Sequence, residues 1–133
     1  MPTNNIIYIS GSPRKNSNTD ILLKMALEIT GGEFIKLSDL MVKPCASCWA
    51  CQKRNNCIID DDMTKNLTPL LLNSDGIVLG SPVYFNNVSA QLKNFIDRTW
   101  CLKKGLKNKI GGAVVVGRRY GAESTITAIN SFF

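Results

Sequence analysis

The chain has 133 residues, 44% of them hydrophobic, a formal net charge of +6 and no histidine. This length supports one domain with a hydrophobic core but not two full domains. Lysine and arginine are spread along the chain without a basic stripe or interleaved aromatic residues, so the charge does not indicate a nucleic-acid partner. The absence of histidine excludes a histidine general acid, general base or metal ligand.

No segment approaches the roughly 20 apolar residues that a bilayer span requires, and the N-terminus lacks the pattern of a secretory signal peptide. We therefore expect a cytoplasmic protein with no membrane partner. In a reducing cytoplasm the five cysteines are not expected to form structural disulfides.

The first predicted element is a strand at residues 6–9. It is followed by a helix that begins with Ser17 or Asn18 as the N-cap and ends at residues 31–32, which are both glycine. This helix carries an apolar stripe formed by Ile21, Leu22, Met25, Ala26 and Ile29. A weaker strand is expected at residues 33–37.

A cysteine-rich loop at about residues 41–60 comes next, followed by a predicted helix at residues 61–73. Acidic residues at the start of that helix favour its N-terminus. Pro69 removes a backbone donor, so we expect a kink, or a restart of the helix with Thr68 as its cap.

The second half of the chain continues the alternation of strands and helices. Its predicted elements are a strand at 76–79, a helix from near Ser89 through Trp100, a strand at 113–116, and a helix through Ile126, Ile129 and Phe132 or Phe133. The continuous apolar runs indicate parallel strands covered on both faces. The alternation predicts an α/β doubly wound sheet with right-handed crossovers, in a single domain over residues 1–133.

A polar loop joins the first predicted strand to the first helix. Ligands of open parallel sheets bind beyond the carboxyl ends of the strands, where a helix N-terminus attracts anions. The candidate phosphate ligands are Ser10, Ser12, Arg14, Ser17, Asn18 and Thr19. The loop lacks the G-x-G-x-x-G and Walker patterns, and the alternative interpretation is a turn with a helix cap.

A second loop follows the third predicted strand. Its side chains Tyr84 and Phe85 can form a flat apolar wall for an aromatic ring, and the backbone amides after Pro82 can bind polar ring edges. The alternative interpretation of the two aromatic residues is ordinary packing.

Four cysteines form a C-x2-C-x2-C-x5-C run: Cys45, Cys48, Cys51 and Cys57. Close spacing of this kind is typical of cubane iron–sulfur sites, whereas zinc sites more often pair two knuckles across a longer insert. Sulfur ligation alone leaves iron and zinc open. Cys57 departs from the ferredoxin pattern, because five residues precede it and Ile58 replaces proline. Cys101 is expected to be a buried or interfacial thiol.

Three motifs carry a family resemblance: G-S-P-R-K-N-S-N-T at residues 11–19, the cysteine run followed by D-D-M at 61–63, and G-S-P-V-Y-F at 80–85 with Q-L-K-N-F-I-D-R at 91–98. Together they resemble the flavodoxin-like NAD(P)H-dependent FMN reductase superfamily, and specifically its iron–sulfur flavoprotein branch. The compact cysteine run is the motif that points to the branch.

The resemblance implies an FMN site and a 4Fe-4S cluster, with zinc as the alternative metal. The first loop would hold the FMN phosphate. The isoalloxazine would contact Pro82, Val83, Tyr84, Phe85 and Asn86, and a third loop would add Gly117, Arg118 and Gly121. The cluster would be held by the four cysteines of the run.

The resemblance also implies a flavodoxin-like sheet with strands in the order 2-1-3-4-5. Four strands are predicted here, so we expect the order 2-1-3-4 with the fifth strand missing from this chain. The unpaired edge of the fourth strand then indicates either a C-terminally incomplete chain, which we favour, or a partner that covers the edge.

The function implied is electron transfer between one-electron and two-electron carriers. The donor would be NAD(P)H or a ferredoxin-like protein, the acceptor a small molecule or a protein, and the assembly a homodimer or homotetramer in which Trp49 helps to form the subunit contact. One alternative is an NAD(P)H-dependent FMN or quinone reductase with a structural zinc site. The other is a non-catalytic redox-sensing module. No side chain is assigned as catalytic.

Overall fold

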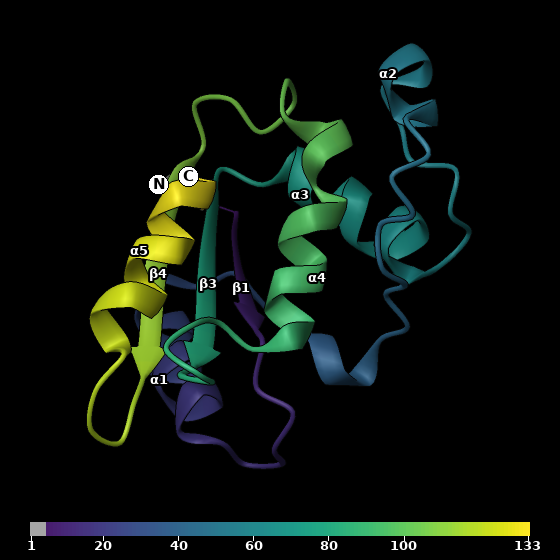
Figure 1. Cartoon of the computed structure of the whole chain (residues 1–133). Coiled ribbons are helices and arrows are strands. Elements are labelled where there is room, and N and C mark those ends of the chain that lie inside the picture. The colour runs from purple at the N-terminus through teal and green to yellow at the C-terminus, as the bar shows by residue number, and fades with distance from the viewer. Residues whose placement is uncertain (1–4) are drawn as a thin grey trace.

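The computed structural model describes residues 5–133, which form a parallel sheet with helices on both faces (Figure 1). The strand order is β2-β1-β3-β4, and each neighbouring pair is parallel. The strands are β1 (Ile6–Ser10), β2 (Glu33–Lys36), β3 (Gly76–Pro82) and β4 (Ile110–Val116). The predicted flavodoxin-like α/β sheet in the order 2-1-3-4 is therefore confirmed.

Helices of both layers position the loops at the carboxyl ends of the strands. Helix α1 (Asn18–Thr30) lies behind the sheet in Figure 1, whereas α4 (Ala90–Arg98) and α5 (Ala122–Phe132) lie in front of it. The core between these layers includes Ile9, Leu79 and Phe95, which are completely buried. Burying each such side chain contributes about 1.5–3 kcal/mol relative to leaving it exposed. No helix in the part of the chain described here is long and apolar enough to cross a membrane.

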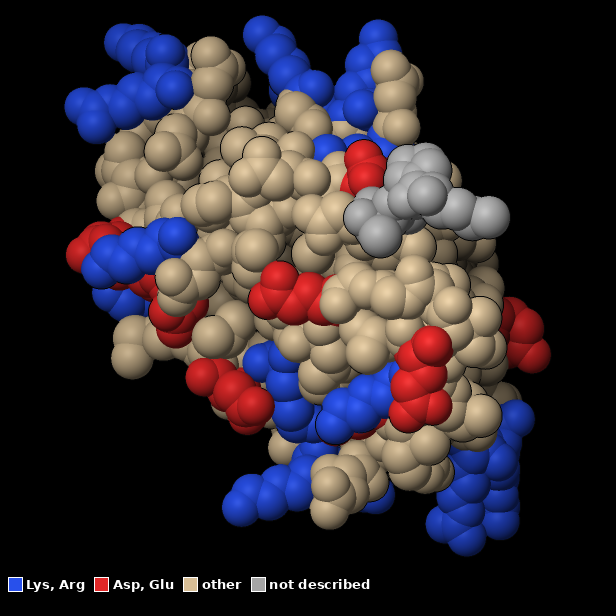
Figure 2. Space-filling model, turned by 180° about the vertical axis from the view of Figure 1, so that it is seen from behind, with Lys and Arg blue, Asp and Glu red and all other residues tan. Residues whose placement is uncertain are grey.

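The apolar stripe of α1 faces outward rather than toward the sheet. Ile21, Met25 and Ile29 are 50%, 55% and 86% exposed, whereas Leu23 is completely buried. The helix packs through Leu23 because the missing side chain of Gly80 in β3 lets α1 approach the sheet closely; an added Cβ there would lie 2.6 Å from Leu23 Cδ1. Seen from this side, much of the molecule is uncharged, with basic side chains at its upper and lower margins (Figure 2).

Strand β4 is less covered than its apolar sequence predicts. Residues 113–116 are only half-buried, because β4 pairs with β3 alone within the described sheet. Helices contact β4 from both faces, as expected, with α1 on one side and α5 on the other, but its edge has no paired strand in the described sheet. Strand β1, which lies between β2 and β3, is buried from Ile7 to Ser10.

The helix predicted at residues 61–73, which contains Pro69, is divided into two parts in the structure. A π-helical turn, η2 (Met63–Leu67), is followed by α3 (Thr68–Asn73). The widened turn bonds the Thr68 amide to the carbonyl of Met63, so the chain continues without the donor that Pro69 lacks. Thr68 has helical backbone angles, so the prediction that it caps a new helix is wrong.

Candidate functional site

The predicted phosphate loop connects β1 to the N-terminus of α1. Ser17 caps the helix, because its hydroxyl accepts a 3.1 Å hydrogen bond from the Asp20 amide. The Arg14 amide donates to the Ser12 hydroxyl at 3.4 Å, which folds the loop back on itself. Ser12 is buried and Asn18 is exposed. Thr19 is buried, and its methyl group lies beside Gly80.

Beneath this loop, the Asp20 carboxylate holds one polar group, the Ser10 hydroxyl, and one cation, the Lys36 ammonium group. The Ser10 hydroxyl donates to one carboxylate oxygen and the Lys36 ammonium binds the other. Burial acts to raise the pKa of Asp20, but the hydrogen bonds from Lys36 and Ser10 outweigh it and hold that pKa below its ordinary value. Ser10 therefore supports the loop from below, and its hydroxyl also accepts a 3.3 Å hydrogen bond from the Ser12 amide.

The second and third loops meet at the carboxyl ends of β3 and β4. The Val83 amide donates to the Val116 carbonyl at 2.9 Å, and Tyr84 and Asn87 exchange backbone hydrogen bonds of 2.9 and 3.0 Å across a tight turn. Both central residues of the turn, Phe85 and Asn86, have positive φ angles. The turn leaves the Phe85 ring fully exposed.

A pocket of 590 Å³ lies between these two loops. It is lined by Val83, Phe85, Asn86, Arg118, Arg119 and Tyr120. Gly117 and Gly121 do not line the pocket but allow the loops to touch: a Cβ on Gly121, where φ is 91°, would lie 2.4 Å from Asn86 Oδ1. The arrangement offers two aromatic rings and two guanidinium groups to a flat, polar-edged ligand.

Ser89 connects the first two loops. Its hydroxyl donates to the carbonyl of Gly11 and accepts a 3.2 Å hydrogen bond from the Leu92 amide as the N-cap of α4. The Ser89 amide donates to the Ser81 hydroxyl at 2.9 Å. Because Ser89 is completely buried, none of these bonds competes with water.

Replacement of Ser89 by alanine is expected to lower the free energy of unfolding by about 1–2 kcal/mol, because the Leu92 amide loses its helix cap and the buried Gly11 carbonyl loses its donor. Urea denaturation followed by circular dichroism measures the change. Ser131→Ala is the matched control, because that exposed hydroxyl only bonds back to the Thr127 carbonyl; its effect is expected to stay within about 0.5 kcal/mol. Equal effects of the two substitutions would contradict the role given to Ser89.

The cysteine loop projects from the domain and contains a short helix, α2 (Ala50–Arg54), which the sequence did not predict (Figure 1). Cys45 and Cys48 are exposed, Cys51 and Cys57 are half-buried, and all are free thiols. Within residues 5–133, no three cysteine or carboxylate side chains gather closely enough to hold a metal ion.

The donor set nevertheless fits an iron–sulfur centre. The ligands offered are sulfur atoms alone, and the Ser47 amide already donates to the Cys45 sulfur at 3.4 Å, a contact that stabilises thiolate ligands. Left-handed backbone at Ser47 and Trp49 turns the chain between successive cysteines. Binding of a metal would then require the loop to close around it.

A larger pocket, of 1610 Å³, separates the cysteine loop from the C-terminal end of α4 and the turn η3 (Trp100–Leu102). Three of the predicted ligands line it, Cys45, Cys51 and Cys57, together with Cys101 from η3. Burial raises the pKa of the Cys101 thiol, and the neighbouring sulfur atoms of Cys57 and Cys51 raise it further. The fold thus places Cys101 beside the cysteine run, although its position in the sequence did not indicate this proximity.

A buried ion pair closes the base of the cysteine loop. Arg98 of α4 forms a two-pronged contact with Asp61, at 2.6 and 3.1 Å, and donates to the Lys43 carbonyl at 2.6 Å. The Lys43 amide in turn donates to Asp61 at 2.9 Å. The side chains of Asp61 and Arg98 are 0% and 1% exposed. Because Lys43 precedes Cys45 and Asp61 follows Cys57, both ends of the loop are tied to α4.

Comparison with known proteins gives the family. Residues 4–133 match the family model of NADPH-dependent FMN reductase. The chain is 46% identical over 137 residues to an iron–sulfur flavoprotein of Methanocaldococcus jannaschii, covering 96% of this chain and 70% of that protein. It is 39% identical over 137 residues to the iron–sulfur flavoprotein of Methanosarcina thermophila, covering 96% of this chain and 71% of that one. The chain belongs to the iron–sulfur flavoproteins of the FMN reductase family.

Solved structures agree with this assignment at the level of the fold. The iron–sulfur flavoprotein superposes with a TM-score of 0.74 on RosB, at 15% identity, covering 97% of this chain and 58% of RosB. A flavodoxin-like, WrbA-like protein from Agrobacterium tumefaciens gives a TM-score of 0.67 at 15% identity, covering 98% and 71%. Family membership identifies the protein as an FMN-dependent oxidoreductase.

Several residues that line the two pockets were not anticipated. Arg119 and Tyr120 line the pocket beside Arg118, and Arg98 and Cys101 line the cysteine pocket. Two consecutive arginines, Arg118 and Arg119, follow a predicted strand, and this was a usable sequence signal for Arg119 and Tyr120. No local signal links Arg98 with Asp61, because 37 residues separate them.

Unfolding of the iron–sulfur flavoprotein is expected to become easier in acid. Burial acts to raise the pKa of Asp61, but hydrogen bonds from Arg98 and the Lys43 amide hold it far below its ordinary value. Asp20 and Asp61 thus bind protons more weakly when folded than when unfolded, where their pKa is about 3.9, so their stabilisation is complete above that value and is lost as the pH falls below it. Urea midpoints at about pH 7, 5 and 3.5 measure this. Equal stability at the two lower values would contradict it.

Proposed function

We propose that this iron–sulfur flavoprotein transfers electrons between one-electron and two-electron carriers, with FMN and a 4Fe-4S cluster as its cofactors. The observation that carries the proposal is the presence, on one chain, of a sulfur-lined pocket and of loops suited to a flavin at the carboxyl ends of the strands. When bound, FMN exchanges electrons singly or in pairs, and the cluster exchanges them singly.

The first loop would bind the FMN phosphate. The amides at the start of α1, the Ser12 region and the Arg14 guanidinium would supply donors and positive charge, while Ser10 and Ser17 hold the loop in shape. Asn18 and Thr19 supply the first amides of the helix. The isoalloxazine would lie against the second and third loops, where Phe85 and Tyr120 exclude water and Arg118 faces the ring edge. Pro82, Tyr84, Gly117 and Gly121 shape these loops.

Replacement of Arg14 by glutamine is expected to weaken FMN binding by about tenfold or more, because a charge-assisted hydrogen bond to phosphate contributes about 1.5–3 kcal/mol. Quenching of flavin fluorescence during titration of the apoprotein measures the dissociation constant. Lys15→Gln is the matched control, an equal loss of charge at the adjacent exposed position, and is expected to change binding by less than about threefold. Similar losses in both variants would indicate general electrostatic attraction and contradict a specific phosphate contact.

The cluster would be held by the four cysteines of the run, Cys45, Cys48, Cys51 and Cys57. Cys45, Cys51 and Cys57 already line the same pocket, and closure of the loop would bring the exposed Cys48 to the metal. Zinc on the same four thiols is the alternative.

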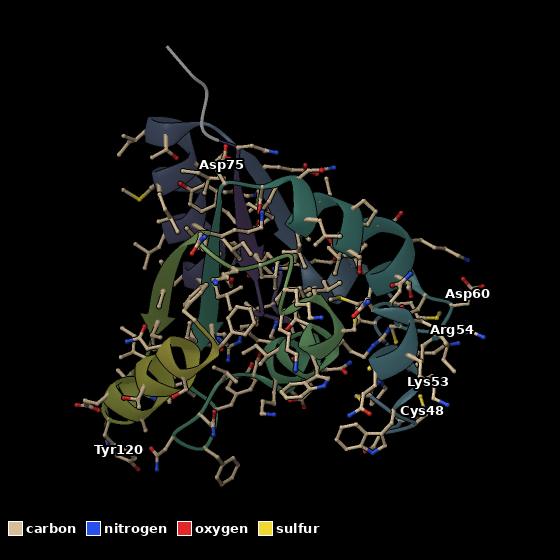
Figure 3. The ribbon with its side chains drawn as sticks, turned by 90° about the horizontal axis from the view of Figure 1, so that it is seen from above. Cys48, Lys53, Arg54, Asp60, Asp75 and Tyr120 are labelled. Atoms are coloured by element: carbon tan, nitrogen blue, oxygen red, sulfur yellow. The ribbon has the colours of Figure 1, made fainter. Side chains whose placement is uncertain are left out.

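The two proposed cofactor sites lie at opposite ends of α4. Ser89, at its start, touches the flavin loops, and Arg98, at its end, lines the cysteine pocket. Seen from above, Cys48 and Tyr120 lie on opposite sides of the molecule (Figure 3). A helix of this length, Ala90–Arg98, spans about 13 Å. We therefore propose that the cluster of one subunit serves the FMN of a neighbour in a homodimer or homotetramer, with the exposed Trp49 at the contact.

The donor in this proposal is NAD(P)H or a ferredoxin-like protein, the acceptor is a small molecule or a protein, and the compartment is the reducing cytoplasm. The alternative function is NAD(P)H-dependent reduction of FMN or a quinone, with a structural zinc site; the description of the family model supports its NADPH-dependent FMN reduction. Bleaching of bound flavin by NADPH alone supports that second function. Bleaching only by reduced ferredoxin supports the first.

Spectroscopy with metal analysis of anaerobically prepared protein tests the proposal. We expect flavin absorption bands, a broad cluster shoulder, and about four iron atoms and four sulfides per chain. Stoichiometric zinc without iron or sulfide would overturn the cluster and favour a zinc-stabilised protein. Absence of flavin bands after addition of FMN would overturn the flavin site.

A further inference from the structure

Arg98 has one donor that the described structure leaves unused. Its Nη1 and Nη2 groups bind Asp61 and the Lys43 carbonyl. Its Nε atom is buried and has no hydrogen-bond partner within residues 5–133. A buried donor without a partner costs about 1–3 kcal/mol, and more on a charged group. Such a group is therefore expected to find its acceptor in another state of the protein.

The acceptor lies in the cysteine pocket. Arg98 and Cys57 both line it. Burial acts to lower the pKa of Arg98, but the hydrogen bond to Asp61 and the interaction with the neighbouring Cys57 side chain outweigh it and raise that pKa. Of the four cysteines of the run, Cys57 is the one whose side chain interacts with the guanidinium group. Cys101 contacts Arg98 differently, since its thiol donates to the backbone carbonyl at 3.6 Å.

We propose that the Nε–H of Arg98 donates a hydrogen bond to the sulfur of Cys57 when Cys57 is a metal ligand, so that Arg98 is a positioning residue for the cysteine centre. This inference rests on the proposed metal centre. Asp61 fixes the plane of the guanidinium, and its remaining donor then orients the ligand that departs most from the ferredoxin spacing. A positively charged donor at a ligand sulfur also favours the reduced, more negative state of an iron–sulfur centre.

Nuclear magnetic resonance on the wild-type protein tests the hydrogen bond directly. The reduced, full chain labelled with ¹⁵N-arginine is loaded with Cd²⁺, a diamagnetic probe for thiolate sites, and the exchange of each arginine Nε–H with water is measured. We expect exchange at Arg98 to slow by about tenfold or more on loading. The exposed Arg54 is the internal control, with unchanged exchange.

The outcomes separate this inference from the proposal on which it rests. Stoichiometric Cd²⁺ binding with slowed exchange at Arg98 supports both. Bound Cd²⁺ with unchanged exchange at Arg98 overturns the inference and leaves the metal centre standing. Failure to bind Cd²⁺ overturns both.

Substitution gives a second measurement on the iron-loaded protein. Arg98→Lys keeps a positive charge toward Asp61 but removes the Nε donor. We expect metal affinity to fall about 10–100-fold. The reduction potential is expected to become more negative by about 59 mV for each tenfold loss of preference for the reduced state in a one-electron couple. Lys93→Gln, which removes an exposed charge at the rim of the same pocket, is expected to change neither.

A folded Arg98→Lys variant with wild-type affinity and potential would overturn the inference, and so would equal shifts in Lys93→Gln. Thermal melting establishes whether the variant is folded. If it is not, the exchange measurement on the wild-type protein decides.

Discussion

Replacement of Asp61 by asparagine is expected to lower the free energy of unfolding by about 3–5 kcal/mol, because removing one partner of a buried ion pair leaves an uncompensated charge. Here that charge is the Arg98 guanidinium, whose side chain is 1% exposed. A loss of this size is a large part of the total stability of a domain, which is about 5–15 kcal/mol. Urea denaturation at neutral pH measures it.

Asp60→Asn is the matched control for this prediction. Asp60 is the preceding carboxylate, and it pairs with Lys65 at 2.9 Å on the surface, where the two side chains are 77% and 61% exposed. An exposed pair contributes about 0–1 kcal/mol, so the control is expected to remain near wild type. Equal losses of the free energy of unfolding in the two variants would contradict the role given to the buried ion pair. Undiminished acid sensitivity of the Asp61→Asn variant, compared with the parent protein, would contradict it too.

Replacement of Cys57 by serine is expected to remove the iron–sulfur centre, with iron per chain falling to about a tenth or less, because a ligand contributes at least as much as the second-shell groups that change affinity 10–100-fold. Iron and sulfide analysis measures the loss. FMN binding is expected to persist, because Cys57 lies at the opposite end of α4 from the flavin loops.

Cys101→Ser is the informative comparison, because Cys101 lines the same pocket from a different element. We expect this variant to retain its iron, since Cys101 lies outside the cysteine run. Loss of iron from the Cys101 variant, with retention in the Cys57 variant, would make Cys101 the fourth ligand and overturn our assignment.

The sequence predicted those parts of the fold that depend on neighbouring residues. The starts of two helices were predicted at Ser17 or Asn18 and near Ser89, because serine and asparagine before an apolar repeat favour a helix N-terminus, and the structure shows Ser17 and Ser89 as the caps. Short apolar runs located the strands, although β3 and β4 are longer than predicted because pairing continues past the apolar residues. Strand order followed from the alternation of elements and the resemblance.

Other features depend on contacts that neighbouring residues do not encode. The repeat of Ile21, Met25 and Ile29 shows that α1 is amphipathic, but not that its sheet-facing side is centred on Leu23. Asp61 was interpreted as a favourable charge at a helix start, whereas its main partner is Arg98, 37 residues away. For Pro69 the alternatives were a kink or a restart of the helix with Thr68 as its cap. Helix α3 does begin at Thr68 with Pro69 in its first turn, but a π-helical turn precedes it and Thr68 is not a cap.

The cysteine loop leaves and re-enters the domain at one point. Met41 bonds to Asp62 and Lys43 bonds to Asp61, so the two ends of the segment lie side by side before the cysteines begin and after they end. A segment closed in this way can vary in length at little entropic expense. Grafting or exchange of residues 44–60 is then expected to leave the predicted flavin loops unchanged, so the proposed metal centre could be replaced without redesign of the rest of the domain.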